Sequence, residues 1–213
     1  MLLIASRFPV VTLALTAVVF AVHTWPGAAA GLQLERAAVA VGEWWRLVAG
    51  HFTHWSADHL VWDVLVFALL GAACEVTSRR RMLITLGIAI VAIPLAVLLW
   101  QPQFHTYRGL SGLDSALFGL LAFDLLREKL RESHHRAVVA IGLLIVAFIA
   151  KAAFESLTGS AVFADSAAGG FVPVPLAHLV GFVSGAITSV ACALSRNRFR
   201  RQSARSSLRW PAI

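Results

Sequence analysis

Charged residues are scarce in this chain, and the scarcity limits what the protein can be. Of its 213 residues, 14% are charged and 59% are hydrophobic. The apolar residues gather in six runs that leave no room for a large soluble domain. Each run approaches the roughly 20 residues that cross a bilayer core as a helix. The runs lie near residues 8–25, 59–77, 82–100, 111–127, 137–157 and 173–195.

The runs lack the alternation of apolar and polar residues that a transmembrane β-barrel requires. Because lipid offers the backbone no hydrogen bonds, helices are the remaining structure that can span. The sequence also has no internal repeat and no low-complexity linker. We therefore predict an all-α polytopic membrane protein, with one six-helix domain over residues 1–195. It includes a first loop over 26–58 and is followed by a basic tail over 196–213.

Cysteine is nearly absent, and the 11 acidic residues are outnumbered by 18 basic ones. Cys74 and Cys192 fall near predicted cytoplasmic ends of spans, so we expect reduced thiols. The net charge is +7, and fourteen of the 18 basic residues fall on one side of a six-pass chain. The positive-inside rule then places both termini in the cytoplasm. We expect the tail to touch anionic lipid rather than nucleic acid. Those fourteen are Arg7, Arg79–Arg81, Arg127, Lys129, Arg131, Arg136 and the six arginines from Arg196 to Arg209.

The first run also resembles a signal peptide, with Arg7 before it and Ala28-Ala29-Ala30 after it. We favour an uncleaved helix, because the loop that follows belongs to the predicted fold. Cleavage would leave the orientation of the other five spans unchanged.

Four polar residues are predicted at one depth in the outer part of the membrane. With the N-terminus inside, the second, fourth and sixth spans all run inward from the outer face. His59 and Asp63 open the second, Ser111 opens the fourth, and His178 is early in the sixth. Polar side chains within a bilayer are costly and usually functional. If the spans pack together, the His178 imidazole can take the Ser111 proton and make a nucleophile.

Small residues support close packing of the fourth and sixth spans. Gly181 and Gly185 form a Gly-x-x-x-Gly below His178, and Gly112, Ala116 and Gly119 give the fourth span a small face. Such residues let membrane helices approach closely. The Ser111 hydroxyl must come within ~3 Å of the His178 imidazole to pass its proton, so the two spans have to pack closely.

Four motifs resemble those of the rhomboid family of intramembrane serine proteases, both in their order along the chain and in their predicted positions in the membrane. The short six-span chain and Tyr107-Arg108 resemble its rhombosortase branch. Two positions depart from the family pattern: Asp63 stands where Asn is usual, and Ser115 stands where Tyr is common. The four motifs are Gly109-Leu-Ser111-Gly112, Ala177-His178 with Gly181 and Gly185, the His54–Asp63 segment, and Trp45-Arg46.

The resemblance implies a six-helix bundle around a water-filled cavity open to the periplasm, in a bacterial inner membrane. It implies peptide hydrolysis by a Ser111–His178 dyad, with the Ser111 N–H and the His59 side chain as oxyanion donors. Gly109 and Asp63 are auxiliary residues of that site. Asp63 could donate only if protonated, or it could instead orient His59 or a water. We see no obvious third acid, although Asp114 lies one turn from Ser111. Lys151 and Glu155 are expected to pair with each other at i, i+4.

The expected partners are transmembrane substrate proteins and membrane lipids, without nucleic acid, metal or cofactor. His51, His54 and His59 could suggest a metal cluster, but they lack the His-Glu-x-x-His pattern of membrane zinc proteases. We therefore expect structural hydrogen bonds for His51 and His54 in the first loop. The rhombosortase branch implies exported substrates with a C-terminal Gly-rich hydrophobic anchor. Two alternatives remain open. An inactive rhomboid-like protein would bind membrane helices without cutting them, and a small transporter would use intramembrane Asp, His and Lys as a proton path.

Overall fold

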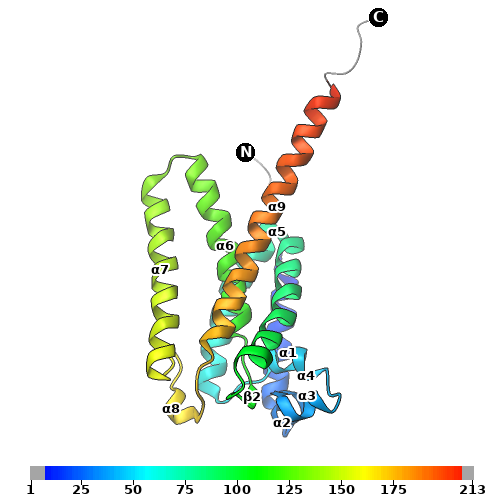
Figure 1. Cartoon of the computed structure of the whole chain (residues 1–213), viewed down its shortest axis with the longest axis vertical. Helices are drawn as coiled ribbons and strands as arrows, with labels where there is room; N and C mark the ends of the chain where they lie inside the picture. Colours follow the sequence, from blue (N-terminus) through cyan, green and yellow to red (C-terminus); the bar gives the residue numbers. More distant parts are fainter. Residues whose placement is uncertain (1–7, 208–213) are drawn as a thin grey trace, which may run out of the picture.

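The computed structural model describes residues 8–207, with side chains described as far as residue 195. Arg7 and residues 208–213 of the predicted tail lie outside the described residues. The described part is mostly helical, with one short pair of strands (Figure 1). Its elements are α1 (Val10–Thr24), α2 (Ala28–Leu32), β1 (Leu34–Glu35), α3 (Arg36–Ala40), α4 (Arg46–Ala49), the 3-10 turn η1 (Gly50–Phe52), α5 (Ala57–Trp100), β2 (Thr106–Tyr107), α6 (Ser111–Arg131), α7 (His135–Thr158), α8 (Ser166–Gly169) and α9 (Pro175–Ser207).

Three of the described helices are long and apolar enough to cross a membrane: α5, α7 and the Pro175–Ser195 part of α9. Helix α1 is apolar but shorter. Helix α6 falls outside this group, and its first 18 residues carry four charged side chains. The sequence predicted two separate helices, 59–77 and 82–100, where the structure has the single 44-residue element α5.

Helix α5 nevertheless consists of two arms. Ser78 has extended backbone angles (φ −164°, ψ 95°) in the middle of the element. Both arms reach the first loop: His51 contacts the Ile90 carbonyl at 3.3 Å, and His54 contacts Asp63 at 3.2 Å. The chain therefore reverses near Ser78, which is why two apolar runs in the sequence correspond to one helical element.

Helices α5, α6 and α9 form the core, and α6 and α9 touch backbone to backbone. A Cβ added at Gly181 would overlap the carbonyl oxygen of Gly112, and one added at Gly185 would overlap that of Ala116. On the other side of the contact, a Cβ at Gly119 would overlap the Phe182 carbonyl oxygen. The predicted close approach of these two spans through small residues is confirmed. Figure 1 shows α9 running beside α6, while α7 stands at the edge of the bundle.

A buried acid ties α1 to α5 at the opposite end from α8 and β2. Both oxygens of Glu75 accept hydrogen bonds from the start of α1, at 3.0 Å from the Val11 N–H and 2.8 Å from the Thr12 N–H. These N–H groups have no partner within their own helix, so a carboxylate there caps it. The Thr12 hydroxyl and the Arg79 guanidinium complete the set. Glu75 therefore has a structural role.

The first loop folds against the segment that leads into α6. Strand β1 pairs antiparallel with β2, with Leu34 opposite Tyr107. Arg46 is buried and donates to the carbonyl oxygens of Ala30 at 2.8 Å and Gln33 at 3.0 Å. The loop thereby fixes the chain four residues before Ser111, and Figure 1 places β2 at the same end of the bundle as α8.

Candidate active site

Ser111 and His178 lie together at one end of the α6–α9 contact. Ser111 is the first residue of α6, and His178 is in the first turn of α9. The Ser111 Oγ is 3.0 Å from the His178 Nε2, a hydrogen-bonding distance. Each residue is within three positions of the glycine contact between Gly112 and Gly181, so close helix packing sets their separation. The geometry is that of a hydroxyl whose proton an imidazole can accept.

Both side chains border a cavity of about 920 Å³. Its walls come from α5, α6, α7 and α9 and from the connecting segments around 103–108, 161–164 and 170–174. His178 is 6% exposed, whereas Ser111 is half-buried. Phe118 and Phe148 are among the apolar side chains that line the cavity. An apolar cavity with a few convergent polar groups suits a bound organic segment better than an ion.

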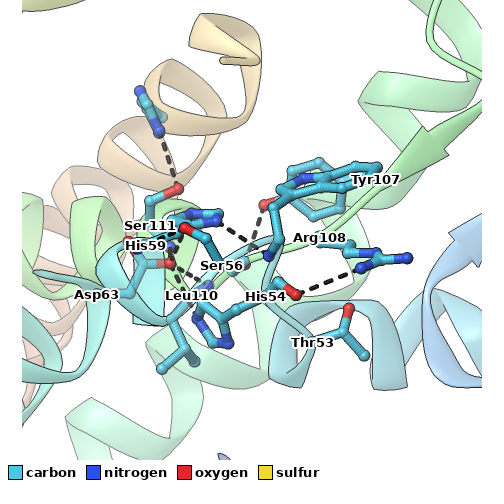
Figure 2. Close-up of polar contacts among 12 residues, drawn as sticks. Thr53, His54, Ser56, His59, Asp63, Tyr107, Arg108, Leu110 and Ser111 are labelled. Atoms are coloured by element: carbon cyan, nitrogen blue, oxygen red, sulfur yellow. Dashed lines mark hydrogen bonds and ion pairs between the residues drawn. The ribbon is translucent and has the colours of Figure 1, made fainter. Parts of the chain in front are cut away.

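The Asp63 side chain, from α5, lies against the first residues of α6. It contacts the groups that are expected to bind an oxyanion. Its Oδ2 accepts from the Leu110 N–H at 2.8 Å and from the Ser111 N–H at 3.2 Å (Figure 2). The same oxygen is 3.3 Å from the His59 Nε2. In this conformation the two groups expected to donate to an oxyanion, the Ser111 N–H and the His59 side chain, both lie against Asp63. A carboxylate is an anion at a helix N-terminus, where N–H groups and the helix dipole favour negative charge.

Gly109 turns the chain into this arrangement. Its φ is +122°, in the region that side chains rarely adopt. A Cβ there would lie 3.0 Å from the His59 ring and 3.1 Å from the Asp63 Oδ2. The Gly109 N–H donates to the Gly50 carbonyl at 3.3 Å. Gly109 thus serves the site through its backbone, by allowing His59 and Asp63 to approach the Ser111 turn.

Two histidines of the first loop, His51 and His54, contact the helix α5 that carries Asp63. His54 is buried, and its Nε2 lies 3.2 Å from the Asp63 Oδ2 (Figure 2). Burial lowers the pKa of His54, although Asp63 opposes the shift. Burial lowers the pKa of His51 to about 4, so this ring is neutral and its Nε2 donates to the Ile90 carbonyl. The expectation of structural hydrogen bonds for these histidines is confirmed, but the contact between His54 and Asp63 was not predicted.

A second acid reaches His178 from α7. Lys151 and Glu155 pair at 2.7 Å, as their i, i+4 spacing predicted. In addition, the Glu155 Oε2 is 3.1 Å from the His178 Nδ1, and the Lys151 Nζ is 3.4 Å from the same nitrogen. The expectation that no third acid approaches the pair is wrong. The available signal was position along the chain: Glu155 lies near the end of α7 and His178 near the start of α9, so the two are close to the connection between these helices.

Ser115 and Asp114, one turn from Ser111, make no hydrogen bond to the Ser111 or His178 side chain in the described part of the chain. Ser115 donates to the Ser111 carbonyl of its own helix at 2.8 Å, as buried helical serines commonly do. Asp114 is buried, and its Oδ1 has no hydrogen-bond partner among the described residues. Neither side chain contacts the His178 ring, whereas Lys151 and Glu155 do.

Comparison with known proteins agrees with this architecture. The profile of the rhomboid domain family matches residues 41–195, about three quarters of the chain. The chain belongs to the rhomboid family. It is 27% identical over 205 residues to a Bacillus subtilis (strain 168) protein named "Putative rhomboid protease YdcA". The matched region spans 90% of this chain and 92% of that protein. Family membership and the apolar helices together make this rhomboid an integral membrane protein.

The carboxylate at position 63 of this rhomboid gives a direct test of how its helix start is used. Asp63→Asn is expected to keep activity or raise it up to about tenfold, because a neutral amide can donate to an oxyanion that a carboxylate repels. The measurement is the rate at which a fluorophosphonate probe labels the purified protein in lipid nanodiscs at neutral pH.

A matched control for that substitution is Asp58→Asn. Asp58 lies in the first turn of the same helix, and its Oδ2 accepts from the Asp165 N–H at 2.7 Å, away from Ser111. This variant should label like the wild type. Complete loss of labelling in Asp63→Asn would mean that the charged carboxylate itself takes part in the reaction.

Proposed function

We propose that this rhomboid is an intramembrane serine endopeptidase. Ser111 is its nucleophile and His178 is its general base, and together they hydrolyse peptide bonds within or beside the transmembrane segments of membrane-anchored proteins. The observation that carries the proposal is the 3.0 Å approach of the Ser111 Oγ to the His178 Nε2 on the wall of a 920 Å³ cavity. Family membership supports the same reaction class.

The reaction proceeds in two halves. The Ser111 Oγ attacks the scissile carbonyl carbon while the His178 Nε2 takes its proton, and the tetrahedral intermediate forms. The C–N bond then breaks, His178 returns the proton to the leaving amine, and an acyl-enzyme remains on Ser111. Water, deprotonated by His178, attacks the ester and releases the second product, and the proton returns to Ser111.

The negative charge on the attacked carbonyl oxygen needs donors. The Ser111 N–H and the His59 side chain are the groups we assign to it, each of a kind whose removal costs about 10²–10³ in turnover. Both lie against the Asp63 Oδ2, at 3.2 and 3.3 Å. The mechanism therefore requires the Asp63 side chain to turn away, or to be protonated, as substrate arrives. Gly109 supplies the turn that keeps these groups close together.

We assign the chain six membrane crossings, counting α1, the two arms of α5, α6, α7 and α9. Both termini then lie in the cytoplasm of a bacterial inner membrane, and the site faces the periplasm. The bend of α5 that carries Arg79–Arg81 and the link between α6 and α7 lie at the end of the bundle opposite α8 and β2, which supports this orientation (Figure 1). In this assignment residues 1–195 form the membrane domain and 196–213 the basic tail.

The proposed substrates are exported proteins with a C-terminal Gly-rich hydrophobic anchor, as in the rhombosortase branch. Glycine weakens helices, so such an anchor would unfold readily in the cavity. The test compares the secreted and surface proteins of cells carrying the wild-type chain with those of cells carrying Ser111→Ala. We expect Gly-rich-anchored proteins to be retained in the mutant membranes. Unchanged release of that class would refute the substrate assignment.

One observation favours a second function, namely binding of membrane helices without cleavage. Asp63 occupies the Leu110 and Ser111 N–H groups with a carboxylate, which a protein without hydrolytic activity could retain permanently. The two functions separate on covalent chemistry, because a non-catalytic protein would not react with a fluorophosphonate at Ser111.

A further inference from the structure

The carboxylate of Glu155 approaches the catalytic imidazole on the side opposite the serine. We propose that Glu155 is a positioning residue that orients His178, so that Ser111, His178 and Glu155 act as a triad contributed by α6, α9 and α7. The inference rests on the proposed hydrolytic function and deepens it. It replaces the dyad with three groups, and it gives α7 a part in the chemistry.

The two oxygens of Glu155 have different partners. Oε1 accepts from the Lys151 Nζ at 2.7 Å and from the Val162 N–H at 3.3 Å. Oε2 lies 3.1 Å from the His178 Nδ1, within ion-pairing distance, and makes no hydrogen bond in the described part of the chain. The side chain is 2% exposed, so bulk water does not compete for Oε2. One oxygen is thus held by its own helix and the loop after it, which leaves the other next to the ring.

The tautomer of His178 decides which neighbour matters. To accept the Ser111 proton, Nε2 must carry its lone pair, so the ring hydrogen must be on Nδ1. A hydrogen on Nδ1 needs an acceptor, and a lysine ammonium has none to offer. Lys151, at 3.4 Å, would instead stabilise the unproductive tautomer. Glu155, at the shorter 3.1 Å, stabilises the productive one and then the imidazolium that forms.

The cavity wall carries other ionisable groups. His59 and Asp63 come from α5, Asp114 comes from α6, and His105, Tyr107 and Arg108 come from the segment before it. Among the described residues, the contacts recorded for the His178 ring are with Ser111, Lys151 and Glu155. A plain ion pair is the competing explanation, in which Glu155 only neutralises Lys151.

The experiment compares Glu155→Gln, Lys151→Gln and the double variant, each folded and purified in lipid nanodiscs. The readouts are the maximal rate and the half-saturating concentration for inactivation by a fluorophosphonate, measured across pH. We expect Glu155→Gln to lower the maximal rate at least about 100-fold with little change in half-saturation, in line with the loss of a triad acid. Lys151→Gln should stay within about tenfold of the wild type, because it leaves the acceptor in place.

The pH dependence gives a second readout. With Glu155 gone, Lys151 alone faces the ring and disfavours its protonation, so the acid limb of the profile moves to lower pH. With Lys151 gone, Glu155 alone favours protonation, so the limb moves to higher pH. Opposite displacements support direct contact of both groups with the ring. Equal losses of rate in the two single variants would overturn the proposal in favour of a structural ion pair.

The double variant covers the case in which a single variant misfolds, because it buries no unpaired charge. It should remain at least about 100-fold slower than Lys151→Gln. A double variant as fast as Lys151→Gln would overturn the role of Glu155. Ser111→Ala separates this result from failure of the proposed function: if the wild type and Ser111→Ala label equally, the hydrolase itself is refuted.

Discussion

Replacing Ser111 by alanine is expected to abolish fluorophosphonate labelling and the cleavage of membrane-anchored substrates. Attack requires an oxygen whose proton the His178 Nε2 can accept, and among the described side chains the hydroxyl that contacts this nitrogen is that of Ser111, at 3.0 Å. Replacing His178 by alanine should slow labelling by about 10³-fold or more, since an unassisted serine is a weak nucleophile. Gel fluorescence of the purified variants measures both effects.

The matched control for this pair is Ser115→Ala. Ser115 is one turn along the same helix, but its hydroxyl donates to the Ser111 carbonyl oxygen. Its removal should change labelling by less than about threefold, because an exchange of that kind at a helical serine alters little beyond one local hydrogen bond. Labelling that persists in Ser111→Ala would leave the chain as a helix-binding rhomboid without hydrolytic function.

The second large effect is expected from one methyl group added at Gly185, about two helical turns after His178 in α9. In Gly185→Ala the new Cβ would overlap the carbonyl oxygen of Ala116, and the helices must move apart. A displacement of about 1 Å at the reacting atoms can cost about 10²-fold in rate. We therefore expect activity to fall by about that factor, with a lower unfolding temperature, because overpacking typically costs about 1–3 kcal/mol.

Gly142→Ala is the control for added volume on a membrane helix. Gly142 lies in α7, and a Cβ built there meets nothing within 4 Å. This variant should retain full activity and unfold at the same or a slightly higher temperature, since alanine favours helix over glycine. Full activity in Gly185→Ala would show that the helices adjust without moving Ser111 from His178.

The sequence predicted the features that depend on residue type and spacing along one helix. Gly181 and Gly185 indicated a close helix contact, and the structure has it with α6. Lys151 and Glu155 were expected to pair because four residues bring side chains to one face, and they do. Local periodicity suffices for such predictions, since it needs no knowledge of the partner helix.

The sequence could not predict which way side chains turn toward other helices. The approach of Glu155 to His178 depends on how α7 is rotated against α9, and nothing within either segment fixes that rotation. The identity of Asp63 was plain, but its contact with the Leu110 and Ser111 N–H groups depends on the turn at Gly109, 46 positions later. Likewise, two apolar runs did not reveal that they belong to one helical element bent at Ser78.

The backbone contact of α6 with α9 has a mechanical consequence. At Gly181 and Gly185 no rotatable side-chain bond stands between the two main chains. Rotamer exchange therefore cannot loosen this contact, and we expect the two helices to tilt together when the bilayer thins or thickens. The hydroxyl and the imidazole would then move together and stay aligned.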